Sequence, residues 1–384
     1  ATKPTAILID GGYASTFQSC ISPDLKHLAK LGYSLDLVVA THIDADHISW
    51  LLSFFKLNGN SQAPKIIQVN DIWHNSLRSL TSSKELEEDS MAPEDKDILV
   101  EIRRRGYPMP SGPLTEPVEI SARQGSTLAA LLLGGGFRWN TGDGTRSINS
   151  TESAPFELCA DVQLRVLGPS VDRLEQLNRQ WIAELRRKGF AGKIGVTDVF
   201  DDAFEFLCAF RDFHDGERSE PTSLSTSSSW CLEDVYKADS SVTNSSSISL
   251  IVEVGSSKLL FLGDSSAEDI ETALRAMPNV TFPMIFDAIK VSHHGSIHNT
   301  SPTLLELIDS SVFLISSNGV LHSHPDLEVL KAIVDRSSDF QRHLHFNYKT
   351  AASQQMRNYI SRSGASFVIH EGSTDWVEIA AREQ

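Results

Sequence analysis

Four side chains that can bind divalent metals fall within six residues near the start of this 384-residue chain. They are two imidazoles and two carboxylates in the pattern His-x-Asp-x-Asp-His, contributed by His42, Asp44, Asp46 and His47. Any one of them alone would be interpreted as a helix cap or an incidental polar residue. The four together favour a metal site, because a helix needs one N-cap and not two carboxylates and two imidazoles.

The elements on either side place this motif at the end of a strand. Residues 35–40 are apolar except for Asp36 and predict a buried strand. Residues 48–55 predict a helix with Asp46 near its N-cap. The motif would therefore occupy the turn from the carboxyl end of a strand into a helix, which is where open α/β sheets usually carry their chemistry.

Other predicted strands end in similar residues. The strands cover residues 258–262, 286–291 and 312–315, and the polar residues after them are Asp264, His293, His294, His298, Asn318, His322 and His324. Histidines of ordinary solvated loops would be scattered without regard to strand ends. This clustering is the main argument for a metal site.

A carboxylate also follows the first predicted strand. Residues 6–9 predict a short buried strand, and Asp10-Gly11-Gly12 follows as a turn. A tight turn alone explains these three residues. The functional alternative is that Asp10 orients a metal-bound imidazole.

The composition is that of a soluble globular protein, with 40% hydrophobic and 22% charged residues. No apolar run approaches the ~20 residues of a membrane span, and no signal peptide is visible. The four cysteines are far apart and lack a Cys-x-x-Cys spacing, so we expect free thiols and a cytoplasmic location. The net charge of −16 disfavours a general nucleic-acid-coating surface, although bound metal ions would cancel part of it.

The length allows two domains, or one large domain with insertions. We expect a core made of residues 1–70, a strand at 161–170 and residues 241–384. It includes a third strand at Lys65–Val69 and a hairpin within 248–262.

Two insertions, residues 71–160 and 171–240, would interrupt this core. The second contains an amphipathic helix with Leu174, Leu177, Trp181 and Leu185 on one face, and a Ser-rich tract at 219–229. We expect it to pack beside the metal site and restrict what enters, with a solvated excursion on the far side as the alternative.

The combined motifs resemble those of the metallo-β-lactamase fold. The resemblance rests on His42-x-Asp44-x-Asp46-His47, Gly263-Asp264, His293-His294-Gly295-Ser296 and His324-Pro325, over roughly residues 5–70 and 241–326. Asp44 stands where the usual motif has histidine. That variant is most similar to the soluble hydrolase domain of ComEC-type competence proteins, as is the segment Asn244-Ser245-Ser246-Ser247. No stretch of these 384 residues resembles the membrane channel of those proteins.

The resemblance implies an αββα sandwich with a pair of divalent metal ions at one edge. His42 and Asp44 would bind one ion, Asp46 and His47 the other, and Asp264 would bridge them. His294 would complete the ligand set. Catalytic roles fall to Asp46, His293 and His324, with His324 facing the substrate, and supporting roles to Asp10, Asn244 and Asn318. The carboxylate of Asp44 makes the site harder, which shifts the expected metal from Zn²⁺ towards Mn²⁺ or Mg²⁺.

A carboxylate-rich pair of metal ions suits displacement at phosphorus. The predicted function is therefore that of a metal-dependent phosphodiesterase, in particular a nuclease, acting on nucleic acid or another phosphodiester. One alternative is a hydrolase of a small ester, a lactam or a cyclic nucleotide. Another is a non-catalytic binding or scaffold module. A protein partner could dock on the insertions, no membrane association is expected, and the sequence does not predict the oligomeric state.

Overall fold

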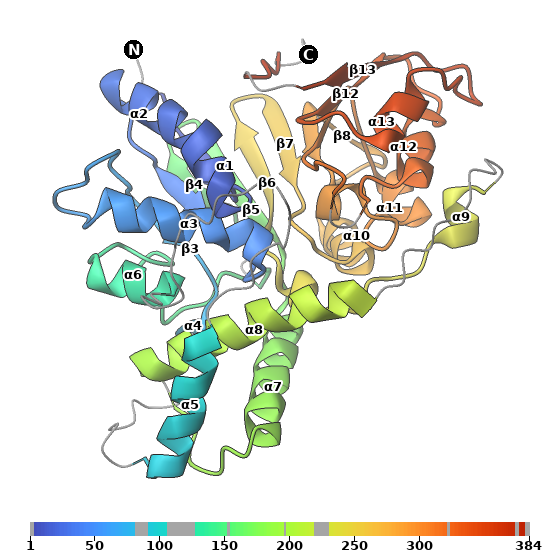
Figure 1. Ribbon diagram of the computed structural model, residues 1–384. Coiled ribbons are helices and arrows are strands. Elements are labelled where there is room, and N and C mark those ends of the chain that lie inside the picture. The colour runs from blue at the N-terminus through green and yellow to red at the C-terminus, as the bar shows by residue number, and fades with distance from the viewer. Residues whose placement is uncertain are drawn as a thin grey trace. The chain divides into compact units, whose positions relative to one another are not determined.

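The computed structural model describes residues 4–80, 91–105, 127–151, 154–195, 197–218, 230–320, 323–372 and 376–380 (Figure 1). The chain divides into two compact units, each built from two stretches of sequence. Unit 1 contains residues 1–148 and 171–218, and unit 2 contains residues 149–170 and 219–384. Helices and strands occur in both units, which confirms the predicted α/β class.

Unit 1 contains a parallel three-stranded sheet in the order β1-β2-β3. Its strands are β1 (Ile7–Ile9), β2 (Leu37–Val39) and β3 (Ile72–Trp73). Ile9 pairs with Val39, and Val39 pairs with Trp73. The carboxyl ends of the parallel strands lie at the same edge of the sheet. Asp10 therefore comes beside the residues that follow β2.

The predicted strand at Lys65–Val69 is wrong. Only Val69 forms an isolated bridge, to Leu35, and the third strand begins at Ile72. The side chain of Asn58 is the physical reason. It accepts hydrogen bonds from the backbone amides of residues 66 and 67 and donates one to the carbonyl of residue 67. Ile67 and Val69 are buried as irregular chain, and the Asn58 side chain satisfies both backbone groups of Ile67.

The helical elements of unit 1 include one helix that lies in the core. They are α1 (Ala14–Thr16), a π-helix (Phe17–Ile21), α2 (Ser22–Lys30), α3 (Ala45–Asn58), α4 (Leu77–Leu80), α5 (Pro93–Arg105), α6 (Leu128–Gly134), α7 (Val171–Arg187) and α8 (Asp198–Arg218). The helix α3 is apolar on nearly all sides, which is typical of a core helix. Its Trp50 and Phe54 pack on Phe17, with ring centroids 6.2 and 6.0 Å away.

Gly11 allows the first turn to approach α3. A Cβ atom at this position would lie 2.2 Å from the indole ring of Trp50. That ring is fully buried and packs against Phe17 and Phe54, which limit its movement. Only glycine fits here, and the close approach positions Asp10 at the edge of the sheet.

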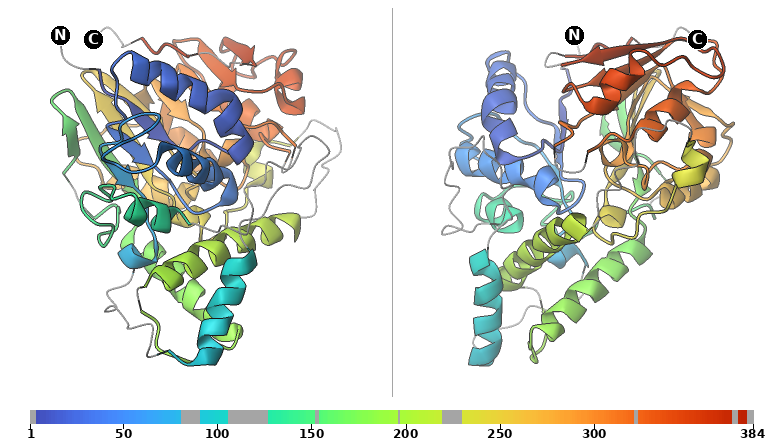
Figure 2. Two further views of the ribbon diagram at one scale, coloured as in Figure 1. Left: turned by 60° about the vertical axis from the view of Figure 1, so that its left-hand side comes forward. Right: turned by 45° about the vertical axis from the view of Figure 1, so that its right-hand side comes forward.

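The predicted amphipathic helix of the second insertion is present as α7. Its four apolar residues, Leu174, Leu177, Trp181 and Leu185, are all buried. Trp181 packs edge-on against Phe204 of α8, with ring centroids 5.6 Å apart. In Figure 2, α8 crosses both α5 and α7, so the helical part of unit 1 has its own packed interior. The Ser-rich tract at 219–229 lies outside the described residues.

Unit 2 is built on an eight-stranded sheet in the order β13-β12-β11-β9-β7-β6-β5-β4. Its strands are β4 (Phe156–Cys159), β5 (Val162–Gly168), β6 (Ser249–Val254), β7 (Ser257–Phe261), β9 (Ala288–Lys290), β11 (Val312–Ile315), β12 (Arg342–Phe346) and β13 (Phe367–Glu371). Neighbours from β4 to β7 are antiparallel, and neighbours from β7 to β13 are parallel. The predicted hairpin is confirmed as β6-β7.

The remaining elements of unit 2 are a two-stranded parallel sheet and short helices. The sheet pairs β8 (Met284–Phe286) with β10 (Ile308–Ser310). The helices are α9 (Leu232–Val235), the 3₁₀ helix η4 (Asn244–Ser246), α10 (Ala267–Ala276), the 3₁₀ helix η5 (Ser292–Gly295), α11 (Pro302–Leu307), α12 (Leu327–Val334) and α13 (Ala351–Met356).

A buried ion cluster joins three of these segments in unit 2. Asp309 on β10 accepts hydrogen bonds from the guanidinium of Arg342 on β12 at 2.6 and 3.1 Å, and from that of Arg336 at 2.9 Å. Arg342 is fully buried. A buried charge needs such partners, because its hydration is lost on folding.

None of the helices in the described ranges is long and apolar enough to cross a bilayer. All four cysteines are free thiols.

Candidate metal-binding site

The first motif lies where the sequence predicts it, in the loop after β2 and the first turn of α3 in unit 1. Asp44 is the N-cap of α3, and Asp46 falls in the first turn of that helix. Negative side chains are favourable there because the helix dipole is positive at its N-terminus. His42 and His47 are buried, with 3% and 5% of their surfaces exposed.

Each imidazole of this loop has a carboxylate beside its Nε2 atom. His42 Nε2 lies 3.4 Å from Asp44 Oδ2, and His47 Nε2 lies 3.7 Å from Asp46 Oδ2. The two imidazole rings are 4.1 Å apart, centroid to centroid. Four donor groups suitable for a divalent cation therefore converge within one loop of unit 1.

The Nδ1 atoms of the same two rings are held by hydrogen bonds. Asp10 Oδ2 lies 2.8 Å from His47 Nδ1, and it accepts a bond of 2.7 Å from the Thr41 hydroxyl. Since that hydroxyl donates its proton to Asp10, it accepts the bond from His42 Nδ1 at 3.0 Å. Both rings thus carry their proton on Nδ1 and present the Nε2 lone pair, as metal-binding histidines commonly do.

Two residues of this region escape the sequence-based prediction. Thr41 connects Asp10 to His42, and a threonine in front of the motif carries no signal of that role. Tyr13 is the second. Burial raises the pKa of its phenol well above the usual range, and the charges of Asp46 and Asp44 raise it further. Its position directly after Gly12 is the signal that could have found it. The phenol stays protonated and can donate a hydrogen bond.

In unit 2 the His-His motif follows β9 in an uncommon backbone conformation. His293 has φ 42° and His294 has φ 55°, both in the left-handed region, and Gly295 has φ 91°. A Cβ at position 295 would lie 2.6 Å from Pro325 Cβ, so glycine is required there. Non-glycine residues held at positive φ cost free energy and are enriched at functional sites.

Both histidines of this motif are fixed through Nδ1. His293 Nδ1 lies 2.7 Å from Asn299 Oδ1, and His294 Nδ1 is hydrogen-bonded to the carbonyl of Ser316. His293 Nε2 lies 3.6 Å from the carboxylate of Asp264. Asp264 is buried, and Asn299 donates to its backbone carbonyl. The unit 2 motifs Gly263-Asp264 and His293-His294 are therefore neighbours in space.

His324 lies against the same group. Its ring centroid is 5.3 Å from that of His293, and its Nδ1 is 3.2 Å from Asp326 Oδ2. Burial lowers the pKa of His324, and the bond to Asp326 opposes that effect only in part. His324 is therefore uncharged at neutral pH. His322 lies outside the described residues.

The two asparagines with predicted supporting roles differ in their surroundings. Asn244 is buried at the start of η4 and donates to Asp239 Oδ2 at 2.7 Å. Asn299, which binds His293, donates to the same carboxylate oxygen at 2.9 Å. Asp239 therefore links Asn244 to Asn299 and, through it, to His293. Asn318 is exposed, and its side chain accepts a bond from the amide of Val320. That bond is a local turn contact.

Comparison with known proteins identifies a family signature in the first third of the chain. Residues 2–129 match the family model described as metallo-beta-lactamase superfamily. The match includes Asp10 and the whole motif from His42 to His47. It provides no specific support for ComEC-type proteins. No curated protein matches this chain.

Proposed function

We propose that this protein is a metal-dependent hydrolase that cleaves phosphodiester bonds, with nucleic acid as its principal substrate class. One observation carries the proposal. In the loop after β2, two imidazoles have Nδ1 held by hydrogen bonds and a carboxylate 3.4 or 3.7 Å from Nε2. This donor set fits a divalent cation, and the superfamily match over residues 2–129 covers it.

The ligand assignment follows the sequence motifs. The proposed ligands in unit 1 are His42, Asp44, Asp46 and His47, and those in unit 2 are Asp264 and His294. That all six bind one pair of ions remains a prediction from the sequence. When bound, such ions lower the pKa of water and polarise the bond under attack.

The donor set points to the type of metal and to the reaction. Three of the six proposed ligands are carboxylates, which suits Mn²⁺ or Mg²⁺ better than a site with only imidazoles would. Asp10 and Thr41 hold the imidazoles in the binding tautomer. His324, uncharged at neutral pH, can accept or donate a hydrogen bond at a phosphoryl oxygen.

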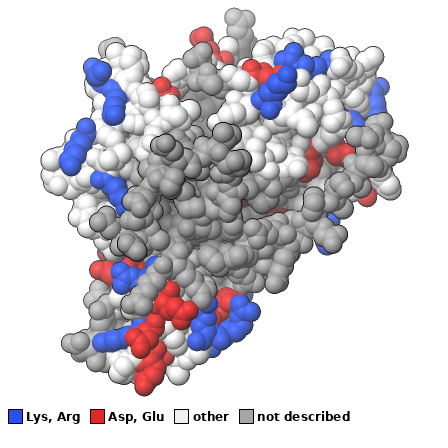
Figure 3. Space-filling view, viewed as in Figure 1, with Lys and Arg blue, Asp and Glu red and all other residues white. Residues whose placement is uncertain are grey.

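The surface charge of the helical part of unit 1 gives the nuclease proposal no further support. In Figure 3, acidic and basic side chains lie close to one another over the region of α5 and α7. Two of the basic residues on α7, Arg179 and Arg187, pair with Glu175 and Glu184. A small phosphodiester such as a cyclic nucleotide is therefore the second candidate, because its binding needs no extended basic surface.

Metal analysis and a substrate panel together test the proposal. Protein purified without chelator and reconstituted with Mn²⁺ should hold close to two ions per chain at the proposed catalytic site. Ions bound at other sites of the chain are not included in this number. The reconstituted protein should also hydrolyse single- or double-stranded nucleic acid. The variant Asp46→Asn should lose this activity and should bind less metal than the parent protein. A protein that binds no ions at this loop, with or without Mn²⁺, would be a scaffold and not an enzyme. Activity on cyclic nucleotides alone would replace the nuclease by the second candidate.

A further inference from the structure

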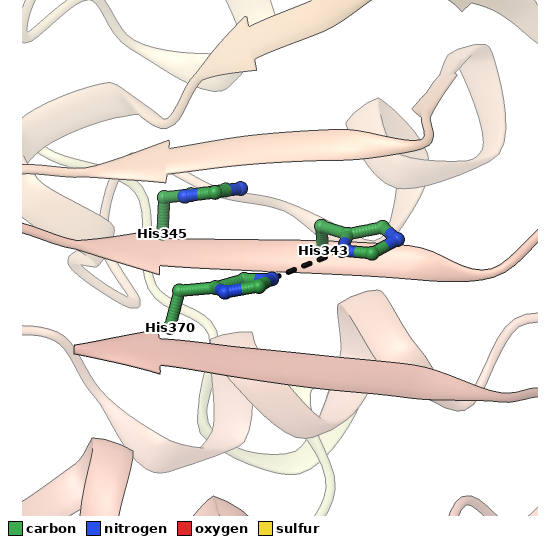
Figure 4. Close-up of side chains that lie close together, drawn as sticks. All are labelled: His343, His345 and His370. Carbon is green, nitrogen blue, oxygen red and sulfur yellow. Dashed lines mark hydrogen bonds between the residues drawn. The ribbon is translucent and has the colours of Figure 1, made fainter. Parts of the chain in front are cut away.

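Three histidines of unit 2 that the proposed function does not use lie on one face of neighbouring strands. His343 and His345 belong to β12, and His370 belongs to β13 (Figure 4). His345 and His370 are direct cross-strand partners. Residues two apart on a strand share a face, so all three imidazoles project from the same side of the sheet.

The ring nitrogens of these histidines converge. His343 Nδ1 lies 3.0 Å from His370 Nε2, and one ring nitrogen from each histidine lies within 4.8 Å of the other two. The rings of His345 and His370 are stacked, with centroids 4.2 Å apart and planes at 9°. Figure 4 shows all three side chains directed to the same space above β12 and β13.

The strand that carries two of them is firmly anchored from its other face. Arg342, Leu344 and Phe346 alternate with the histidines along β12, and all three are fully buried. Arg342 is held by the carboxylate of Asp309. The backbone that presents the imidazoles is thus part of the packed sheet, and rigid elements hold ligands more accurately than loops do.

The histidines line a cavity of about 530 Å³ together with Trp376 and Glu378. All three are half-buried, so solvent ions can reach them. Burial lowers the pKa of His345 to about 4, and the neighbouring histidines lower it further. Burial also lowers the pKa of His370. Uncharged imidazole is the form that binds metals.

We propose that His343, His345 and His370 form a second metal site, which binds one divalent transition-metal ion such as Zn²⁺. Imidazole suits Zn²⁺, Cu²⁺ and Ni²⁺ and is a poor ligand for Mg²⁺ and Ca²⁺. Nitrogens bound to tetrahedral Zn²⁺ at about 2.1 Å lie about 3.4 Å from each other. The His343–His370 pair, at 3.0 Å, is close to that spacing, and small rotations of the half-exposed rings would bring all three nitrogens to it. Three protein ligands leave one coordination position, which would face the cavity.

The test is the stoichiometry of Zn²⁺ in the full chain. Metal-free parent protein and the variant His345→Asn/His370→Asn are titrated with Zn²⁺ against a chromophoric chelator. We expect the variant to bind one equivalent fewer than the parent. Because the loop after β2 is intact in both proteins, that difference does not depend on whether the proposed catalytic site binds metal. Equal stoichiometry in parent and variant would overturn the second site.

Two further measurements keep the result interpretable. His27→Asn is the matched control, because His27 is exposed on α2 and should leave the Zn²⁺ stoichiometry unchanged. The single variant His343→Asn should weaken the affinity of the second site at least about tenfold, since even outer supporting residues contribute that much.

If the double variant fails to fold, the parent protein alone decides. Bound Zn²⁺ should protect the peptides that carry His343, His345 and His370 from diethyl pyrocarbonate, as measured by mass spectrometry. His27 should react equally with and without Zn²⁺. Equal modification of the three histidines with and without Zn²⁺ would mean that they only stack and hydrogen-bond with one another.

Discussion

At the residue scale, the chemistry of the first loop depends on hydrogen bonds from side chains that are not ligands. Asp10 holds both His47 and the Thr41 hydroxyl, and that hydroxyl in turn holds His42. One carboxylate therefore sets the tautomer of two imidazoles.

Replacing this carboxylate should weaken metal binding without unfolding the protein. Asp10 has φ 49°, a conformation that asparagine tolerates, so Asp10→Asn keeps the backbone. The neutral amide is a weaker acceptor for His47, and we expect metal affinity or hydrolytic rate to fall about 10–100-fold. Competition with a chelator measures the affinity. Asp161→Asn, in the exposed turn before β5, is the control, and an equal loss in both variants would remove the special role of Asp10.

At the element scale, the first loop is positioned by the contact between the turn after β1 and the helix α3. Glycine is the only residue type that fits at position 11, because a Cβ there would overlap the indole ring of Trp50. The same helix carries Asp44 and Asp46 at its N-terminus, so the packing of α3 and the placement of the ligands are linked.

A methyl group at this contact should destabilise unit 1. In Gly11→Ala the new Cβ would overlap a buried indole ring, and overpacking of this kind costs about 1–3 kcal/mol of unfolding free energy. Gly134→Ala is the control, because nothing lies within 4 Å of a Cβ there, and we expect it to be neutral or slightly stabilising. Urea denaturation followed by fluorescence compares the two. A parent-like midpoint for Gly11→Ala would show that α3 shifts at little cost.

The helix α8 should make stability depend on pH. Burial raises the pKa of both Asp201 and Asp202 to about 6. Arg78 offsets part of this rise at Asp201, and Thr127 and Arg103 offset part of it at Asp202. Between about pH 4 and 6 the folded state therefore binds more protons than the unfolded state. The contribution of these groups to stability is complete below about pH 4 and is lost as the pH rises through 6.

Removing one of these carboxyl groups tests the sign. In Asp202→Asn the unfolding free energy should fall less than in the parent protein between pH 4 and 6.5. Urea titrations at several pH values measure the difference. The variant Asp172→Asn, at an exposed position of α7, should keep the slope of the parent. An Asp202→Asn slope that equals the parental one would assign the pH dependence to other groups.

At the scale of the whole molecule, the sequence predicted strands that are followed by candidate metal ligands. It did not predict that the chain divides into two units. The strands at 37–39, 162–168 and 249–261 follow from local alternation and apolar runs. The predicted strand at 65–69 failed because Asn58 takes over the hydrogen bonds that a neighbouring strand would make. The histidines of β12 and β13 were missed because their cluster forms only when two strands distant in sequence pair.

Unit 2 depends on an ion cluster that no sequence pattern reveals. Asp309→Asn would leave the buried guanidiniums of Arg336 and Arg342 without their shared counter-charge. Breaking a buried ion pair from one side costs about 3–5 kcal/mol. Hydrogen exchange measured by mass spectrometry should show lost protection in β10 and β12. The control is Glu306→Gln, at an exposed position of α11, which should leave hydrogen exchange unchanged. Unchanged exchange in Asp309→Asn would contradict the prediction and would mean that the two arginines find other partners.

The locked imidazoles of the first loop also bear on how quickly metal is loaded. His42 and His47 already present Nε2, because Asp10 and Thr41 hold their Nδ1 atoms. An arriving ion then finds two donors oriented before it binds, and little of the binding free energy is used to order side chains. We therefore expect the rate of metal uptake to follow the rate at which each ion sheds its water, with Mg²⁺ slower than Mn²⁺.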